Sequence, residues 1–82
     1  MLFRSVETQG LAFLRQLDLK TVKPEIKEAK GIVPNEVASY LLNKKREELT
    51  ELESKRKVSI VIEGDPKMVS GENDIILLTH TN

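Results

Sequence analysis

The segment from Pro34 to Lys57 constrains the fold more than any other part of the chain. Its sequence, P-N-E-V-A-S-Y-L-L-N-K-K-R-E-E-L-T-E-L-E-S-K-R-K, predicts one long amphipathic helix. A stop and an N-cap at Pro34 and Asn35 precede Glu36, and three basic residues end the segment, a charge order that suits the helix dipole. The apolar stripe recurs at steps of three, four and seven residues, as Ala38, Leu42, Leu49 and Leu52, and is widened by Val37 and Leu41. We expect the rest of the chain to pack against this stripe.

Lys45 interrupts the stripe between Leu42 and Leu49, where pure packing would favour a leucine. Two interpretations stay open. Its methylene stem can run along the edge of the core with the ammonium in water, which we favour, or Lys45 can mark where the helix meets a partner.

Three strands and a first helix are predicted around this segment. Ser5 is typical of an N-cap and begins a helix that ends before Pro24. The run 25–33 is too short for a helix and predicts a strand. Residues 58–63 alternate apolar and polar side chains with the period of a half-buried strand, and Asp74 to Thr79 forms the last β run after a turn-rich connector.

The order helix, strand, helix, strand, strand predicts an α+β two-layer fold. We expect a mixed three-stranded sheet with two helices on one face, in a single domain over residues 1–82, with residues 1–4 and 80–82 frayed. The first two strands should be parallel through a right-handed crossover, and the last two should form an antiparallel hairpin.

The last strand is apolar on both sides. If Ile75 and Leu77 face the helices, Ile76 and Leu78 lie on the opposite face, close to Val61 in the expected hairpin. A sheet with helices on one side has water on the other, so Val61, Ile76 and Leu78 are our candidates for an interface that a partner covers. The alternative is that they are ordinary surface aliphatics, which are common.

The composition excludes several classes of protein. Thirteen basic and thirteen acidic residues cancel among 82, so no net charge attracts the chain to nucleic acid or membranes. The absence of cysteine excludes disulfides and thiolate zinc sites. No apolar run approaches the roughly 20 residues needed to span a bilayer, and the start does not follow the pattern of a signal peptide. We therefore expect a cytoplasmic protein without a membrane partner.

Catalytic and metal-binding motifs are scarce. No glycine-rich phosphate loop occurs, and His80, the only histidine, lies close to the end of the chain. A small hydrolase that uses His80 with nearby carboxylates is therefore a weak alternative. Four carboxylates gather around the last connector and could hold a hard cation, but their spacing does not match a calcium loop: Glu63, Asp65, Glu72 and Asp74. We predict no catalytic residue and no metal ligand in this chain.

Lys44, Lys45 and Arg46 are the candidates for RNA contact, because they form a basic cluster on the central helix with a second cluster at 55–57. Glutamates interrupt the basic residues, and Glu51 and Lys55 have the spacing of a helical ion pair. A salt-bridged solvent face therefore stays open as the alternative.

The central segment I-V-P-N-E-V-A-S-Y-L-L-N-K-K-R resembles I-V-P-x-x-[VI]-A-S-Y-L-L-N-x-K-R of bacterial ribonuclease E and ribonuclease G. The run R-S-V-E-T-Q-G-L-A-F-L-R resembles the helix after the zinc-link of those enzymes, and V-S-I-V-I-E-G-D-P resembles their following strand and turn. The resemblance covers nearly the whole chain and corresponds to the small domain at the C-terminal end of the catalytic half.

The resemblance implies a non-catalytic domain that supports oligomerisation and lies near bound RNA. The magnesium-binding aspartates and zinc-link cysteines of the family precede this region and have no counterpart here, so magnesium and zinc belong to the parent and no cofactor is expected in this chain. We expect self-association, contact with the rest of the parent nuclease, and auxiliary RNA docking in RNA processing and decay. The alternative is a free-standing small RNA-binding module.

Overall fold

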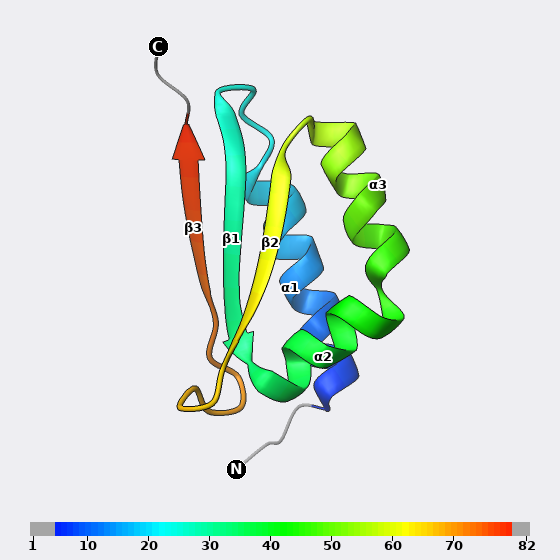
Figure 1. The fold of residues 1–82 in the computed structure, drawn as a ribbon, viewed down its shortest axis with the longest axis vertical. Coiled ribbons are helices and arrows are strands. Elements are labelled where there is room, and N and C mark those ends of the chain that lie inside the picture. Colours follow the sequence, from blue (N-terminus) through cyan, green and yellow to red (C-terminus); the bar gives the residue numbers. More distant parts are fainter. Residues whose placement is uncertain (1–4, 80–82) are drawn as a thin grey trace.

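The structure, a computed structural model, describes residues 5–79, which form six elements of secondary structure (Figure 1). The elements are α1 Val6–Lys20, β1 Ile26–Pro34, α2 Asn35–Lys44, α3 Arg46–Arg56, β2 Ser59–Asp65 and β3 Asp74–Thr79. The N-cap predicted at Ser5 is confirmed, because its Oγ accepts a hydrogen bond of 3.0 Å from the Thr8 N–H. The residues predicted to fray, 1–4 and 80–82, lie outside the described residues.

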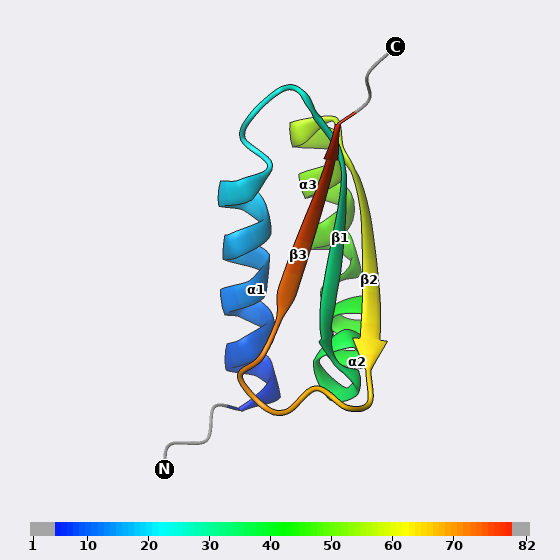
Figure 2. The same ribbon diagram turned by 90° about the vertical axis from the view of Figure 1, so that its left-hand side faces the viewer.

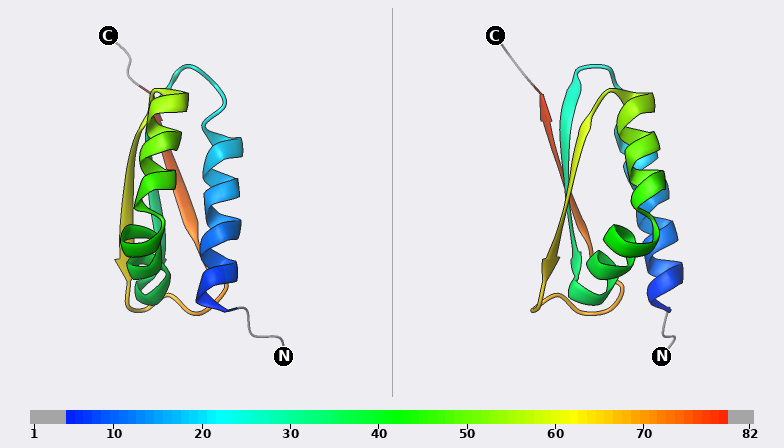
Figure 3. Two further views of the ribbon diagram at one scale, coloured as in Figure 1. Left: turned by 90° about the vertical axis from the view of Figure 1, so that its right-hand side faces the viewer. Right: turned by 45° about the vertical axis from the view of Figure 1, so that its right-hand side comes forward.

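The strands form a mixed sheet in the order β2, β1, β3, as the sequence predicts for an α+β fold. β1 is parallel to β2 and antiparallel to β3. The helices lie together on one side of this sheet (Figures 2 and 3). The predicted two-layer architecture is therefore confirmed, with one helix more than expected within residues 5–79.

The predicted hairpin between the last two strands is wrong. β3 pairs with β1 and not with β2, so β2 and β3 form opposite edges of the sheet. The connector 66–73 passes across the end of β1, as Figure 1 shows. Hairpin loops usually have about two to five residues, and a connector longer than this can cross a neighbouring strand.

The central helix is divided in two at Lys45. Its backbone, at φ −122° and ψ 24°, leaves the helical range. The Lys45 N–H donates to the Leu41 carbonyl as the last bond of α2, and the Lys45 carbonyl accepts from the Leu49 N–H at the start of α3, both at 3.1 Å. The bend changes which residues form the buried stripe: Leu41 and Leu49 are buried, whereas Leu42 is 38% exposed and does not belong to the core as predicted.

The core lies between the helices and the sheet and depends on a close approach at Gly31. A Cβ atom on Gly31 would lie 2.5 Å from Cζ of Phe13, so only glycine lets this ring lie against the backbone of β1. Gly10 serves α1 in the same way, because a Cβ there would lie 2.5 Å from Cδ2 of Tyr40 on α2. The other buried apolar residues are Leu17, Ile26, Ala29, Val33, Val37, Ala38, Leu41, Leu49, Leu52 and Val58.

Candidate interaction surface

The side of the sheet opposite the helices is uncovered by any described element, and we call it the open face (Figure 2). Side chains alternate between the two faces along a strand, so every second residue of β1 lies on the open face. The residues paired with these on β2 and β3 lie on the same face. It comprises Glu28, Lys30 and Ile32 of β1, Ser59, Val61 and Glu63 of β2, and Asp74, Ile76 and Leu78 of β3.

The predicted interface residues Val61, Ile76 and Leu78 all lie on the open face and are 44%, 41% and 46% exposed. In register, Lys30 separates Val61 from Ile76, and Glu28 separates Ser59 from Leu78. Val61 therefore does not lie next to Ile76 or Leu78 as the predicted hairpin required. The three aliphatics instead flank the central strand from its two sides.

An ion pair crosses the open face from β1 to β2. The Lys30 ammonium lies 3.5 Å from Oε1 of Glu63, and both side chains are well exposed. Water screens such a pair, so it contributes little to stability. The ion pair directs the Lys30 ammonium toward β2, at one edge of the sheet. The methylene stem of Lys30 stays between Val61 and Ile76.

The contribution of β1 to this surface is not evident from the sequence pattern. Lys30 and Ile32 lie on the open face because Ala29, Gly31 and Val33 face the helices. These five residues alternate between the two faces, but the sequence pattern does not show it clearly. Gly31 has no side chain and so is not recognised as an inward-facing apolar residue.

The candidate RNA-contact residues Lys44, Lys45 and Arg46 lie at the junction of α2 and α3, and we call them the basic corner (Figure 1). Lys44 and Arg46 are exposed and have no ion-pair partner within residues 5–79. The Lys45 side chain is 26% exposed and its ammonium lies 3.5 Å from Oε2 of Glu48. Lys45 is thus a half-buried residue at a helix junction, with its ammonium at the surface.

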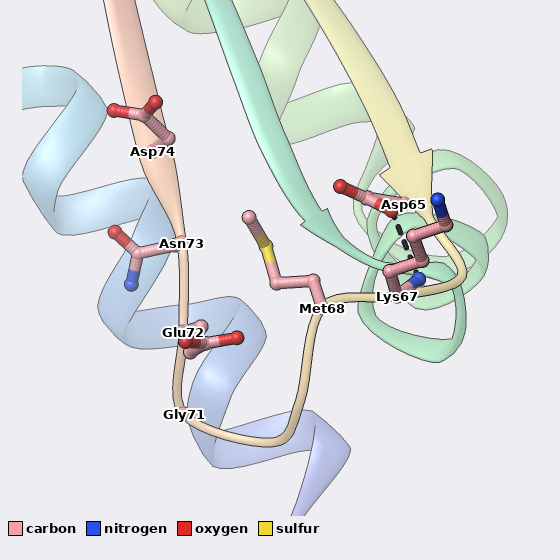
Figure 4. A pocket seen from close by; sticks show the side chains of 7 residues that line it. All are labelled: Asp65, Lys67, Met68, Gly71, Glu72, Asn73 and Asp74. Atoms are coloured by element: carbon pink, nitrogen blue, oxygen red, sulfur yellow. Dashed lines mark hydrogen bonds between the residues drawn. The ribbon is translucent and has the colours of Figure 1, made fainter.

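The four carboxylates around the last connector do not converge. The Asp65 carboxylate accepts a hydrogen bond from the Lys67 N–H, and the Glu72 carboxylate accepts one from the Val69 N–H, each at 2.9 Å. Both therefore stabilise turns of their own loop. Asp65, Glu72 and Asp74 line an open hollow of about 490 Å³. Figure 4 shows how their side chains lie. No group of three or more potential ligands for a metal ion occurs within residues 5–79.

A second hollow, of about 640 Å³, lies between α1 and α3 on the helical side. Leu14 and Leu52 provide its apolar part, among charged residues of both signs. At its border Arg56 donates two hydrogen bonds, of 3.0 and 2.7 Å, to Oδ1 of Asp18. The hydrogen bond and positive charge of Arg56, with Lys55 nearby, lower the pKa of Asp18. This ion pair ties α1 to α3.

His80 lies outside the described residues, so no geometry bears on it. Within residues 5–79, no helix has the length and hydrophobicity to span a bilayer.

Fold and surface together define a small α+β domain with one helical layer and one uncovered sheet face. The model of the ribonuclease E/G thioredoxin-like domain family matches residues 2–78. The chain belongs to this family. The chain has no cysteine, so the family name implies no thiol chemistry for these 82 residues.

A curated relative is similar to much of the chain. The chain is 37% identical over 59 residues to ribonuclease E of Haemophilus influenzae. The match covers 72% of this chain and 6% of the relative, so the chain spans only a small part of that protein's length.

Proposed function

We propose that this chain is a non-catalytic domain of a ribonuclease E/G-type endoribonuclease and that it joins copies of the parent enzyme through the open face of its sheet. The observation that carries the proposal is the set of aliphatic side chains on that face. Val61, Ile76 and Leu78 are each more than 40% exposed on a side without helices. Covering them removes apolar surface from water, which is the main driving force for association.

The expected strength follows from the size of the surface. Burial contributes about 25 cal/mol per Å² of apolar surface, and association must first overcome the loss of translational and rotational freedom. A few half-exposed aliphatics therefore support a weak dimer of the isolated chain. In a parent enzyme, neighbouring domains would raise the effective concentration and strengthen the same contact.

The chemistry of RNA cleavage then belongs to the rest of the parent. Magnesium and zinc, the metals of the parent in this proposal, would be held outside this chain. The domain would serve RNA processing and decay in the cytoplasm by setting the quaternary structure. A coding sequence upstream with paired zinc-link cysteines and magnesium-binding aspartates would support this role, and its absence would favour a free-standing module.

Sedimentation equilibrium of the 82-residue chain over a wide range of concentration tests the proposal. The mean mass should rise toward that of a dimer for the wild type and should stay at that of the monomer for Ile76→Lys. The reason is that association would bury the new lysine charge without an opposite charge beside it, which is costly. Leu19→Lys is the matched control, since Leu19 is 64% exposed on α1. It should associate as the wild type does. A wild type that stays monomeric, or association unchanged in Ile76→Lys, would remove the proposal.

The basic corner supports auxiliary RNA docking as a second function. Its favouring observation is that Lys44 and Arg46 carry exposed charges that no carboxylate of residues 5–79 neutralises. Such charges bind phosphates and release counterions, so their contribution falls as the salt concentration rises.

Binding of a single-stranded polyuridine oligonucleotide, followed by fluorescence anisotropy against salt, tests this second function. Replacing Lys44, Lys45 and Arg46 by alanine should flatten the slope of log K against log salt by up to about two units, at about 0.7 per phosphate contact. The control removes the same charge elsewhere, from the exposed residues Lys20, Lys23 and Lys27. Equal losses in both variants, or no binding at low salt, would refute RNA docking at the basic corner.

A further inference from the structure

The helical layer leaves a groove between two of its helices. α1 approaches α2 closely at Gly10, whereas α1 and α3 touch less extensively and run side by side in the same direction (Figure 3). The hollow of about 640 Å³ lies between α1 and α3, and we call it the helix groove. Within residues 5–79, no helix or strand covers it on the outer side of the layer. The helical layer is therefore open at this position.

The floor of the helix groove is apolar. Leu14 of α1 is half-buried and Leu52 of α3 is 8% exposed, and both line the groove. Leu11 precedes Leu14 by three residues, which places it on the same side of α1, and it is 47% exposed. Apolar side chains of a partner can therefore be buried along this line.

The two walls of the helix groove carry charges without partners. Arg15 on α1 and Glu51 on α3 both line the groove and are exposed, and neither forms an ion pair within residues 5–79. Glu48 lines the α3 wall about one turn before Glu51, and its carboxylate lies 3.5 Å from the Lys45 ammonium. The α3 wall is therefore acidic, and a single unpaired guanidinium lies on the α1 wall.

The groove is held in shape at its border. Arg56 of α3 donates two hydrogen bonds to Oδ1 of Asp18 on α1, and the Lys55 ammonium lies 3.6 Å from the same oxygen. These contacts tie the two helices together and limit their relative movement. A partner therefore meets a groove that is already formed, and binding requires less ordering of this chain.

The shape of the groove suits a helix better than a small molecule. Sites for small molecules enclose most of the ligand surface, whereas the helix groove is open to water. Its lining residues on α3 extend from Glu48 to Lys55, which corresponds to about 10 Å or two helical turns. A helix of about three turns can lie along this length with its apolar side chains between α1 and α3, which is a common mode of peptide recognition.

We propose that the helix groove binds an amphipathic, basic helix of a partner protein. Apolar side chains of that helix would lie on Leu14 and Leu52, and its lysine or arginine residues would lie beside the two carboxylates of the α3 wall. Charge complementarity selects a basic partner, because Arg15 alone is left to attract an acidic one. The groove and the open face lie on opposite sides of the molecule, so this inference does not rest on the association proposed above.

Titration of the 82-residue chain with a synthetic amphipathic peptide, followed by methyl NMR, locates the contact. The peptide has about 14 residues, with leucines on one face, lysines along one flank and glutamines along the other. Methyl signals of Leu14 and Leu52 should shift as peptide is added, whereas those of Val61 and Ile76 on the open face should not. A scrambled peptide of the same composition is the control. Equal shifts with the scrambled peptide, or shifts confined to the open face, would overturn the inference.

A charge reversal at Glu51 tests the chemistry of the partner. Glu51→Arg makes the groove basic on both walls and should weaken binding of the lysine peptide by about fivefold or more. It should strengthen binding of a second peptide that has glutamate in place of lysine. Glu36→Arg is the matched control, because Glu36 is exposed in the first turn of α2 and does not line the groove. Equal effects of the two variants would reveal attraction to the whole chain and refute a specific site.

A pair of alanine variants on α1 tests the apolar floor. Leu14→Ala should weaken binding of the lysine peptide by about fivefold or more, since it removes apolar surface from the contact. Leu19→Ala is the control, because Leu19 is 64% exposed and does not line the groove. Circular dichroism shows whether Leu14→Ala is folded, and the exposed position Glu51 provides the test if it is not. Unchanged binding in folded Leu14→Ala would contradict the proposed contact.

The outcomes separate this inference from the proposed function. Peptide binding at the helix groove by a chain that stays monomeric would support the groove and remove association through the open face. Association through the open face without any peptide binding would do the reverse. If the Leu14 and Leu52 signals shifted with the concentration of the chain alone, a second copy would fill the groove and the inference of a basic helical partner would be wrong.

Discussion

The two faces of one sheet carry aliphatic side chains at neighbouring positions of the same strands, yet they are organised differently. On the covered face, Gly31 receives the ring of Phe13, and the side chains interlock with the helices. On the open face, Lys30 takes the equivalent central place, with Val61 and Ile76 on its two sides and an ion pair to Glu63. Complementary shape on the covered face therefore determines stability, whereas the aliphatic side chains of the open face stay exposed on both sides of Lys30.

Phe13→Ala should cause the largest loss of stability. Phe13 is 1% exposed, and truncating a buried phenylalanine usually costs about 3–5 kcal/mol because it also leaves a cavity. Urea unfolding followed by circular dichroism measures the loss. Ile76→Ala on the open face is the control and, at concentrations where the chain is monomeric, should cost less than about 1 kcal/mol. Equal losses of stability in the two variants would contradict the conclusion that the covered face determines stability.

Gly31→Ala should have the next largest effect. The new Cβ would lie 2.5 Å from Cζ of Phe13, so the ring or the strand must move, and overpacking of this kind costs about 1–3 kcal/mol. Its neighbour Lys30 faces the other way, and Lys30→Ala should change the free energy of unfolding by only about 0.5 kcal/mol. If Gly31→Ala were neutral or stabilising, the close approach of Phe13 would not be a determinant of the fold.

Asp18→Asn should have a smaller effect that depends on pH. The pKa of Asp18 in the folded chain is lowered by Arg56, so its contribution is present above the unfolded pKa of about 3.9 and is lost as pH falls through the folded pKa. The Asp18 side chain is 38% exposed, and water limits the contribution to about 0.5–1 kcal/mol. Urea unfolding of both proteins should show a difference in stability at pH 7 that begins to narrow below about pH 4 and closes once the pH lies below the folded pKa of Asp18. A difference in stability that persists in acid would show that it does not arise from the ion pair of Asp18 with Arg56.

The sequence predicts the covered face better than the open one. The N-cap at Ser5, the strand Asp74–Thr79 and the inward positions Ile75 and Leu77 follow from local chemistry and a period of two. The partner of β3 does not, because strand order depends on where the connector 66–73 crosses, and residue periodicity carries no information on that path.

The break at Lys45 and the position of the candidate interface show the same limit. A stripe residue that should be leucine marks the junction of two helices, where each helix turns its own apolar side to the core. Val61, Ile76 and Leu78 share a face, as the sequence predicts, but Lys30 separates Val61 from Ile76 because β1 lies in the centre of the sheet. Their contact with a partner stays a prediction.

The accessibility of methyl groups to a soluble paramagnetic probe, measured by NMR at increasing concentration, tests whether the open face is the surface that joins a partner. Methyl signals of Val61, Ile76 and Leu78 should lose their relaxation enhancement as the chain associates. Leu19 and Val69, which are 64% and 62% exposed away from the open face, are the references and should keep theirs. If all five residues remained equally accessible, or if the references alone became protected, the open face would not be the surface through which this domain joins a partner.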